Sequence, residues 1–177
     1  MKKLLRFAVQ LIFPTRRPLN KFIKSISNEF VGLDIIEIGS GNDALSQSSK
    51  IYFKNPNTFI KTDINKGYDH MYLDITKELT INEKFDLVIC NYVLEHIFEV
   101  KKAIFNLTQL LKENGQLLIA VPMIYPLHDE PADFWRFTEH SLKKLFNEFT
   151  ILKFKHTGLR QFPSQYILLL EQDKKSL

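Results

Sequence analysis

Leu33-Asp34-Ile35-Ile36-Glu37-Ile38-Gly39-Ser40-Gly41-Asn42-Asp43-Ala44 is the stretch that decides the fold of this chain. The apolar run over residues 33–38 predicts a buried strand, and the Gly-x-Gly after it predicts a turn where the backbone passes close to another group. In an α/β sheet such a turn lies at the carboxyl end of a strand, where ligands bind. We therefore expect the functional site around this loop.

The chain has the size and composition of one soluble globular domain. Its 177 residues are 45% hydrophobic and 25% charged, which is ordinary for a protein with a substantial core. The single cysteine, Cys90, lies in an apolar run and is expected to be buried and reduced. The apolar stretch Leu4–Phe13 is shorter than the roughly 20 residues that span a bilayer, and it lacks a signal-peptide cleavage site. These features predict a cytoplasmic protein.

Positive charge is concentrated in the first 28 residues, which hold seven basic residues and no acid. The remainder has 17 basic against 20 acidic residues, a net charge of −3, so nucleic-acid binding is not expected. The spacing of apolar residues predicts two short amphipathic helices around a basic kink at Pro14 and Pro18. Their apolar faces either cap the sheet of their own domain or dock on an anionic membrane surface at the inner face of the membrane. We divide the chain into an arm, residues 1–29, and a globular domain, residues 30–177.

Alternating strands and helices predict an α/β, Rossmann-like, doubly wound fold. The predicted strands cover residues 33–38, 57–63, 71–74, 85–91, 116–121, 151–154 and 166–170. Helices are predicted over residues 42–50, from Val93 to Leu111, where Asn114-Gly115 would form the C-cap, and after Thr138, which would be the N-cap. The result is a mostly parallel seven-stranded sheet that ends in an antiparallel strand.

Two classes of cofactor are compatible with the glycine loop. Residues 39–44 match the dinucleotide pattern G-x-G-x-x-A, and Asp63 suits the acid that binds ribose hydroxyls. This favours a nicotinamide-dependent oxidoreductase. However, a pyrophosphate disfavours nearby anions, and the loop is flanked by Glu37 and Asp43. These acids suit a cofactor with a cationic group.

The glycine loop and three later segments of the chain resemble class I S-adenosylmethionine-dependent methyltransferases. Glu37-x-Gly39-x-Gly41 is similar to their motif I. Residues 85–97, FDLVICNYVLEHI, are similar to a strand and LEH helix of the broad family that includes the ubiquinone-biosynthesis type, and residues 110–119 resemble its next helix-to-strand segment. The loop YPLH..P.DFWRFT, residues 125–138, resembles a bacterial, type 11-like subgroup often associated with modification of cell-surface glycans or secondary metabolites.

The resemblance implies S-adenosyl-L-methionine as the cofactor. It implies that Glu37 faces the methionine ammonium, that Asp63 binds the ribose and that Asp74 binds the adenine amino group. The full set of implied cofactor-binding residues is Glu37, Gly39, Ser40, Gly41, Asp63, Ile64, Asp74, Ile75, Asn91 and Tyr92. Two points stay open: Asn91 either lines the site or caps a helix, and Asp43 stands where the family commonly has a third glycine.

The loop after the fifth strand holds the candidate catalytic residue, His128, because an imidazole titrates near neutral pH and can act as a base. The alternative is a structural loop histidine. Tyr125, Trp135 and Arg136 would bind the acceptor with His128. Alternatively, Trp135 packs the loop onto the domain and Arg136 pairs with a nearby acid.

The remaining expectations concern metals and acceptors. Glu95 and His96 are placed in the first turn of a helix, where Glu95 interacts with the helix dipole and His96 is structural. The acids at positions 129, 130 and 133 have no metal-ligand spacing, so no metal site is predicted. The expected acceptor is a small molecule, a glycan or a lipid-linked molecule. A non-catalytic module that keeps the fold is the remaining alternative.

Overall fold

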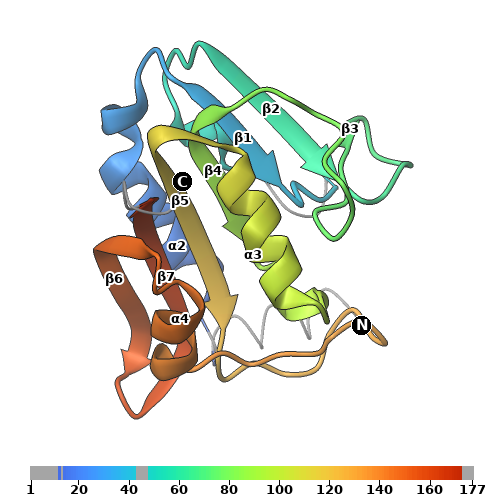
Figure 1. The fold of residues 1–177 in the computed structure, drawn as a ribbon. Coiled ribbons are helices and arrows are strands. Elements are labelled where there is room, and N and C mark those ends of the chain that lie inside the picture. The colour runs from blue at the N-terminus through green and yellow to red at the C-terminus, as the bar shows by residue number, and fades with distance from the viewer. Residues whose placement is uncertain (1–11, 13, 43–47, 173–177) are drawn as a thin grey trace.

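The computed structural model describes residues 12, 14–42 and 48–172, which form a seven-stranded sheet with helices on both faces (Figure 1). The strand order is β3-β2-β1-β4-β5-β7-β6. Only β7 runs antiparallel to its neighbours, β5 and β6. The predicted Rossmann-like sheet is therefore confirmed. The strands are β1 (Asp34–Ile38), β2 (Thr58–Asp63), β3 (Met71–Tyr72), β4 (Phe85–Asn91), β5 (Leu111–Pro122), β6 (Phe149–Leu159) and β7 (Phe162–Gln172), and the helices are α2 (Arg16–Ile26), α3 (Val100–Gln109) and α4 (Glu139–Leu145).

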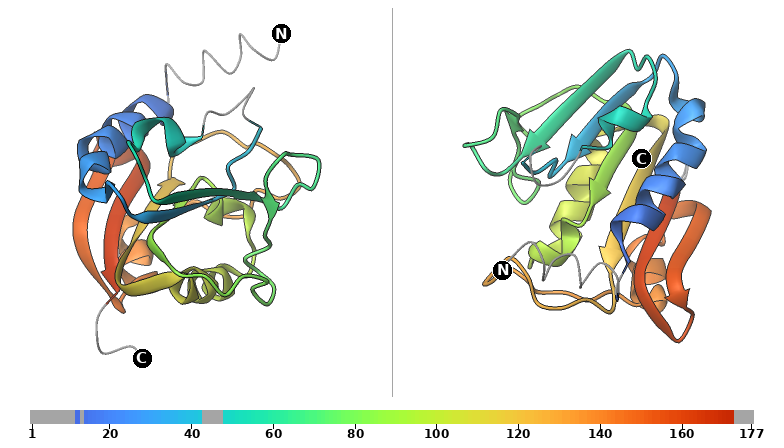
Figure 2. Two further views of the ribbon diagram at one scale, coloured as in Figure 1. Left: turned by 90° about the horizontal axis from the view of Figure 1, so that it is seen from above. Right: turned by 180° about the vertical axis from the view of Figure 1, so that it is seen from behind.

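Each face of the sheet has its own buried core, because successive strand residues point to opposite sides. Ile36 and Val88 belong to the cluster that includes residues of α3 and α4. Ile35 and Leu87, their neighbours in sequence, belong to the cluster that includes residues of α2. Figure 2 shows α2 and α3 on opposite sides of the sheet.

The apolar face of α2 covers the sheet of its own domain, as one of the two readings predicted. Leu19, Phe22, Ile23 and Ile26 are at most 3% exposed and share a cluster with residues of β1, β4, β5 and β7. This face is therefore not available to a membrane. The first predicted amphipathic helix lies outside the described residues except for Ile12, and the domain boundary at residue 29 stays a prediction. Within the described residues, no helix is both long and apolar enough to cross a bilayer.

The helix predicted from Val93 is wrong in its first two turns. A short 3₁₀ turn covers Leu94–His96, and α3 begins only at Val100. The reason is a long-range contact: the carbonyl of Glu95 accepts the backbone N–H groups of Phe134 and Trp135, at 2.8 and 3.2 Å. Glu95 therefore does not lie in the first turn of an α-helix, and the predicted interaction with the helix dipole is wrong.

The predicted C-cap at Asn114-Gly115 is also wrong, because α3 ends at Gln109 and both residues lie within β5. Asn114 has a φ of 60°. A Cβ at position 115 would lie 2.9 Å from the carbonyl oxygen of Phe85. The glycine therefore allows β5 to lie close to the start of β4. The prediction missed this because the same residue pair ends many helices.

Two further predictions concern the segments beside the site. Thr138 is confirmed as the N-cap of α4, since its side chain accepts the N–H of Ser141 in a reciprocal capping box. Of the helix predicted over residues 42–50, the structure describes only the two ends, and a 3₁₀ turn covers Ser49–Tyr52. Asp43 and the rest of residues 43–47 lie outside the described residues.

Candidate functional site

The carboxyl ends of β1, β2 and β4 lie at one edge of the sheet, the lower edge in Figure 1. The glycine loop after β1 lies at this edge. Gly39 and Gly41 have φ values of 66° and 68°, in the left-handed region that favours glycine. A Cβ at Gly39 would collide with the side chain of Val93. The sequence therefore places glycine where both the backbone angle and the space require it.

Glu37 is a buried carboxylate beside this loop. It is 6% exposed. Its oxygens accept hydrogen bonds from the backbone N–H of Ser49 at 2.8 Å, the hydroxyl of Ser40 at 3.1 Å and the hydroxyl of Ser48. These donors are neutral, and no cation among the described residues forms an ion pair with Glu37. A buried carboxylate without a cation suits a ligand that brings a positive charge.

Asp63, at the end of β2, is bonded to the glycine loop. One carboxylate oxygen accepts the N–H of Gly41 at 2.9 Å, and the other accepts the N–H of Asn65 at 2.8 Å. Asp63 is 8% exposed, whereas Ile64 beside it is 63% exposed. The glycine loop, the carboxylate of Asp63 and the exposed side chain of Ile64 are thus adjacent.

His70 is a residue that the sequence analysis did not single out. Its Nε2 lies 2.8 Å from the carbonyl oxygen of Gly41, and its Nδ1 lies 2.7 Å from the carbonyl oxygen of Asp69. It therefore fastens the loop before β3 to the glycine loop. A lone histidine in a polar loop gives no local signal of such a contact.

Asp74 and Ile75 lie just beyond β3. The carboxylate of Asp74 accepts both the N–H and the hydroxyl of Thr76, at 2.9 and 2.7 Å. Ile75 is only 3% exposed and belongs to the core. Asp74 is partly exposed and remains the better placed of the two to meet a ligand.

Asn91 and Tyr92, which follow each other at the end of β4, have different surroundings. Both amide atoms of Asn91 are buried, yet neither has a hydrogen-bond partner in the described part of the chain. No cap bond satisfies it, so the alternative of a helix N-cap is not observed. Tyr92 has a φ of 57°, and its hydroxyl donates to the side chain of Gln165 on β7. Its ring therefore faces α2 and β7.

These groups fit S-adenosylmethionine. Its ammonium suits the Glu37 carboxylate, which has no cation. Its ribose diol suits an acceptor such as Asp63, and its polar methionine end suits the unpartnered amide of Asn91. The residues that would hold it are Glu37, the backbone of Gly39 to Gly41, Asp63, Asp74 and Asn91.

Arg136 holds the loop over residues 123–138 together. All five of its N–H groups are engaged: with both carboxylate oxygens of Asp133, at 2.6 and 2.8 Å, and with the carbonyl oxygens of Tyr125, Pro126 and Trp135. These bonds hold the pKa of Asp133 well below its usual range. The predicted acceptor contact through Arg136 is therefore corrected, because no donor is left for a ligand. The alternative, pairing with a nearby acid, is observed.

Trp135 packs the same loop onto the domain. Its indole N–H donates to the carbonyl of Ile97 at 2.9 Å, and its ring stacks on Phe98 with 5.8 Å between centroids. Phe98 is 67% exposed and Trp135 37% exposed. One face of this aromatic pair is thus open to solvent beside the site.

A cavity of about 150 Å³ lies between the end of β4, this loop and the start of α2. It is lined by Thr15, Arg16, Tyr92, Glu95, His96, Pro122, Tyr125, His128 and Asp129. Two of the predicted acceptor-binding residues, Tyr125 and His128, are among them. Trp135 and Arg136 are not.

Two histidines face each other in this cavity, with 4.9 Å between the ring centroids of His96 and His128. The Nδ1 of His96 lies 2.6 Å from the carbonyl oxygen of Ala132, and that of His128 lies 3.2 Å from the carbonyl oxygen of Pro126. A carbonyl only accepts, so in the neutral form of each ring the proton is on Nδ1 and Nε2 is the acceptor. The Nε2 of His96 lies 4.0 Å from Oε1 of Glu95, and the Nδ1 of His128 also lies 3.3 Å from Oδ2 of Asp133.

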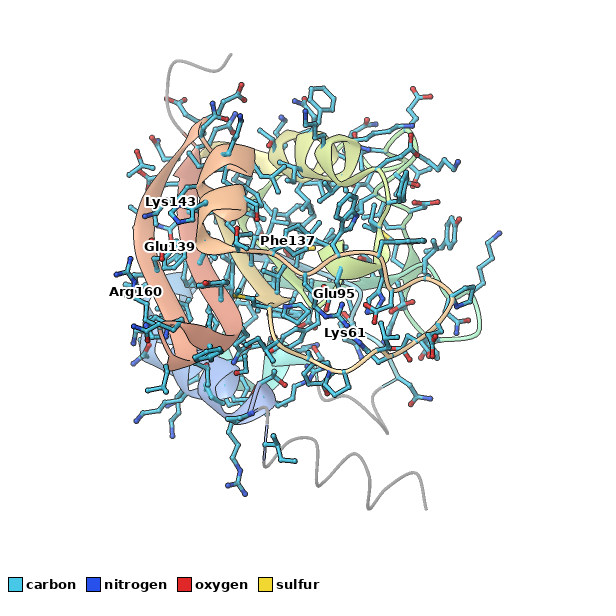
Figure 3. The ribbon with its side chains drawn as sticks, turned by 90° about the horizontal axis from the view of Figure 1, so that it is seen from below. Lys61, Glu95, Phe137, Glu139, Lys143 and Arg160 are labelled. Atoms are coloured by element: carbon cyan, nitrogen blue, oxygen red, sulfur yellow. The ribbon has the colours of Figure 1, made fainter. Side chains whose placement is uncertain are left out.

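Glu95 lies close to both histidines, and Figure 3 shows it beside the loop over residues 123–138. It is fully buried, and neither carboxyl oxygen has a hydrogen-bond partner in the described residues. Burial raises its pKa to about 8. Ligand atoms of Glu95, His96 and His128 all lie within 4.8 Å of one another, so this trio could hold a metal ion. The sequence analysis missed it because His128 is distant in sequence from the other two.

Comparison with known proteins shows the family of this chain. Residues 9–162 match the family model described as "Methyltransferase domain". The ubiquinone biosynthesis O-methyltransferase of Rickettsia prowazekii is 29% identical over 109 residues, which are 55% of this chain and 43% of that protein. The chain thus spans less than half the length of this relative.

Solved structures share the fold. An S-adenosylmethionine-dependent methyltransferase from Clostridium acetobutylicum aligns with a TM-score of 0.70, covers 97% of this chain and 98% of its own, and is 17% identical. The N-methyltransferase NodS from Bradyrhizobium japonicum, bound to S-adenosyl-L-homocysteine, aligns with a TM-score of 0.66, covers 91% and 89%, and is 15% identical. With the family match over most of its length, the chain belongs to the methyltransferase domain family.

Proposed function

We propose that this chain transfers a methyl group from S-adenosylmethionine to an oxygen or nitrogen atom of a small-molecule acceptor. The observation that carries the proposal is the buried carboxylate of Glu37, which lies near the end of β1, beside the glycine loop, and forms no ion pair with a described cation. The same carboxylate argues against an oxidoreductase, because a pyrophosphate at this loop would meet an uncompensated negative charge.

The cofactor supplies a reactive methyl group on a sulfonium. The chain would bind and orient it: Glu37, Ser40 and Asn91 would hold the methionine end, Asp63 the ribose, and Ile64, Asp74 and Ile75 the adenine. Gly39 and Gly41 let the backbone approach. Tyr92 would contribute to cofactor binding from the wall between the cofactor site and the acceptor cavity, which it lines.

The acceptor would enter the cavity that Tyr125 and His128 line. His128 is our candidate base, since its Nε2 can take the proton that the acceptor hydroxyl or amine loses as the new bond to carbon forms. His96 presents a second Nε2 and is the alternative base. Arg136 and Trp135 act by holding the loop that carries His128.

The acceptor is either free or attached to a glycan or lipid, and we place the protein in the cytoplasm, with peripheral membrane contact through the basic residues before Pro14. The arm, residues 1–29, includes α2, and α2 contributes to the core. Deletion of the whole arm would therefore unfold the domain. Substitution of Lys2, Lys3 and Arg6 by Gln is the better test. Unchanged binding to anionic vesicles would reject the membrane contact.

Calorimetric titration tests the proposed cofactor. We expect S-adenosylhomocysteine to bind, NAD not to bind, and Glu37→Gln to weaken the first without lowering the melting temperature. Absence of S-adenosylhomocysteine binding would reject the proposal. Binding without methyl transfer to any member of an acceptor panel, followed with a labelled methyl group, would favour a non-catalytic module.

A further inference from the structure

A cation from the N-terminal helix lies at the acceptor cavity. Arg16 is the first residue of α2 and lines the cavity. Its guanidinium carbon is 5.1 Å from the centroid of the Tyr92 ring. It forms no hydrogen bond or ion pair with another described residue. Its five N–H donors are therefore available to a molecule that enters the cavity.

Buried side chains of β7 hold the backbone just before Arg16, whose side chain is exposed. Gln165, which is 0% exposed, donates to the carbonyl of Thr15 at 2.8 Å and accepts the hydroxyl of Tyr92. Ser164 donates to the carbonyl of Pro14 at 3.0 Å. The backbone before Arg16 and the ring beneath its guanidinium are thus attached to the same glutamine. Arg16 is part of the cavity wall.

The acids of the cavity form no ion pair with this cation. Glu95 is fully buried, and neither of its carboxyl oxygens has a hydrogen-bond partner among the described residues. Asp129 is exposed. The cavity therefore combines a guanidinium, a buried carboxyl group and two imidazoles.

The size of the cavity limits what reaches these groups. A closed cavity of about 150 Å³ admits one benzene ring, and this cavity has about the same volume. The part of the acceptor inside it is therefore about one six-membered ring in size. A longer substituent would extend through the open side.

We propose that the acceptor carries an oxyanion, a carboxylate or a phosphate, on a group of single-ring size, and that Arg16 binds this oxyanion. A planar guanidinium forms paired, charge-assisted hydrogen bonds with either group. The reacting hydroxyl or amine then faces His96 and His128. The inference rests on the proposed function and adds the charge of the acceptor.

The test uses three ring compounds: benzoate, phenyl phosphate and benzamide, which is the neutral analogue of benzoate. Binding to the full chain saturated with S-adenosylhomocysteine is measured by ligand-observed NMR titration. We expect at least one anion to bind at least about tenfold more tightly than benzamide. The anion that binds more tightly shows whether the oxyanion of the acceptor is a carboxylate or a phosphate.

Arg16→Gln is compared with Arg17→Gln, a matched variant of the next residue, which does not line the cavity. We expect the first to weaken anion binding at least about tenfold and the second to leave it unchanged. Equal binding of benzoate, phenyl phosphate and benzamide, equal effects of the two variants, or no saturable anion binding would overturn the inference. S-adenosylhomocysteine binding is titrated in the same samples. If it is intact in a variant, the variant is folded and the proposed cofactor site is present, so a loss of anion binding then concerns Arg16 alone.

Discussion

The backbone N–H of Gly41 donates to a carboxylate oxygen of Asp63 at 2.9 Å, and this bond joins the loop after β1 to the acid that ends β2. The acid thus orders the loop as well as offering its remaining lone pairs to a ligand. Two elements that are separated by more than twenty residues act as one binding unit.

Replacement of Asp63 by Asn should weaken S-adenosylhomocysteine binding by about 10- to 100-fold, because hydrogen bonds to a charged group contribute about 1.5–3 kcal/mol. Calorimetric titration measures this. Asp69→Asn, at an exposed acid in the following loop, is the control. Equal affinities of the two variants would contradict the ribose role of Asp63.

Gly39→Ala should lower the free energy of unfolding by about 2 kcal/mol, since a residue with a Cβ is strained at this φ. It also collides with Val93. Val93→Ala in the same chain should restore only part of the loss, because the backbone strain remains. Gly67→Ala, where φ is ordinary, should be nearly neutral. Denaturant titration measures all of these, and a neutral Gly39→Ala would disprove the positive-φ requirement.

Arg136→Lys should destabilise the chain nearly as much as Arg136→Ala, by about 2 kcal/mol, because an ammonium cannot replace five directed donors around the buried Asp133. Lys143→Ala, which removes an exposed pair with Glu139 (Figure 3) and a cation–π contact with the ring of Phe154, should cost less than about 1 kcal/mol. Thermal unfolding distinguishes these outcomes. An Arg136→Lys variant as stable as the parent would show that charge alone suffices.

The same pair sets a pH dependence. The folded-state pKa of Asp133 is lowered by Arg136. Its contribution to stability is therefore present above the ordinary aspartate pKa and is lost only as the pH falls through the lowered value. The stability difference between the parent and Asp133→Asn should stay constant from neutral pH down to the ordinary aspartate range and shrink only below it.

Glu95 should have the opposite effect. Burial raises its folded-state pKa from 4.5 to about 8. Between these two pH values the folded state binds one more proton than the unfolded state. The free energy of unfolding therefore falls as the pH rises, by up to about 1.4 kcal/mol per pH unit. Glu95→Gln has no such proton, so it should gain stability relative to the parent between pH 5 and 8. Parallel stability curves for the two chains would contradict the raised pKa.

The strands that carry the site were predictable because their signals are local. Apolar runs mark β1, β2 and β4, an acid stands near the end of β1 and at the end of β2, and the glycines mark a turn after β1. The start of α3 was not predictable in this way. The carbonyl of Glu95 is bound by residues almost forty positions later, and periodicity carries no information on such a contact.

The cavity was missed for the same reason. It assembles Arg16 from α2, Glu95 from the 3₁₀ turn after β4 and His128 from the loop after β5. Each of these residues has an ordinary local environment. Only the topology of the sheet brings them together, so a single sequence read locally could nominate His128 but not its neighbours.

The place of β7 in the sheet has a consequence for synthesis. β7 is the last described strand, yet it lies between β5 and β6. Until it is inserted, β5 exposes an apolar edge, and Gln165 is not yet there to hold Thr15 and Tyr92. A nascent chain on the ribosome therefore has its cofactor loop before it has its acceptor cavity, and a chain that stalls before β7 would be prone to aggregate and unable to select an acceptor.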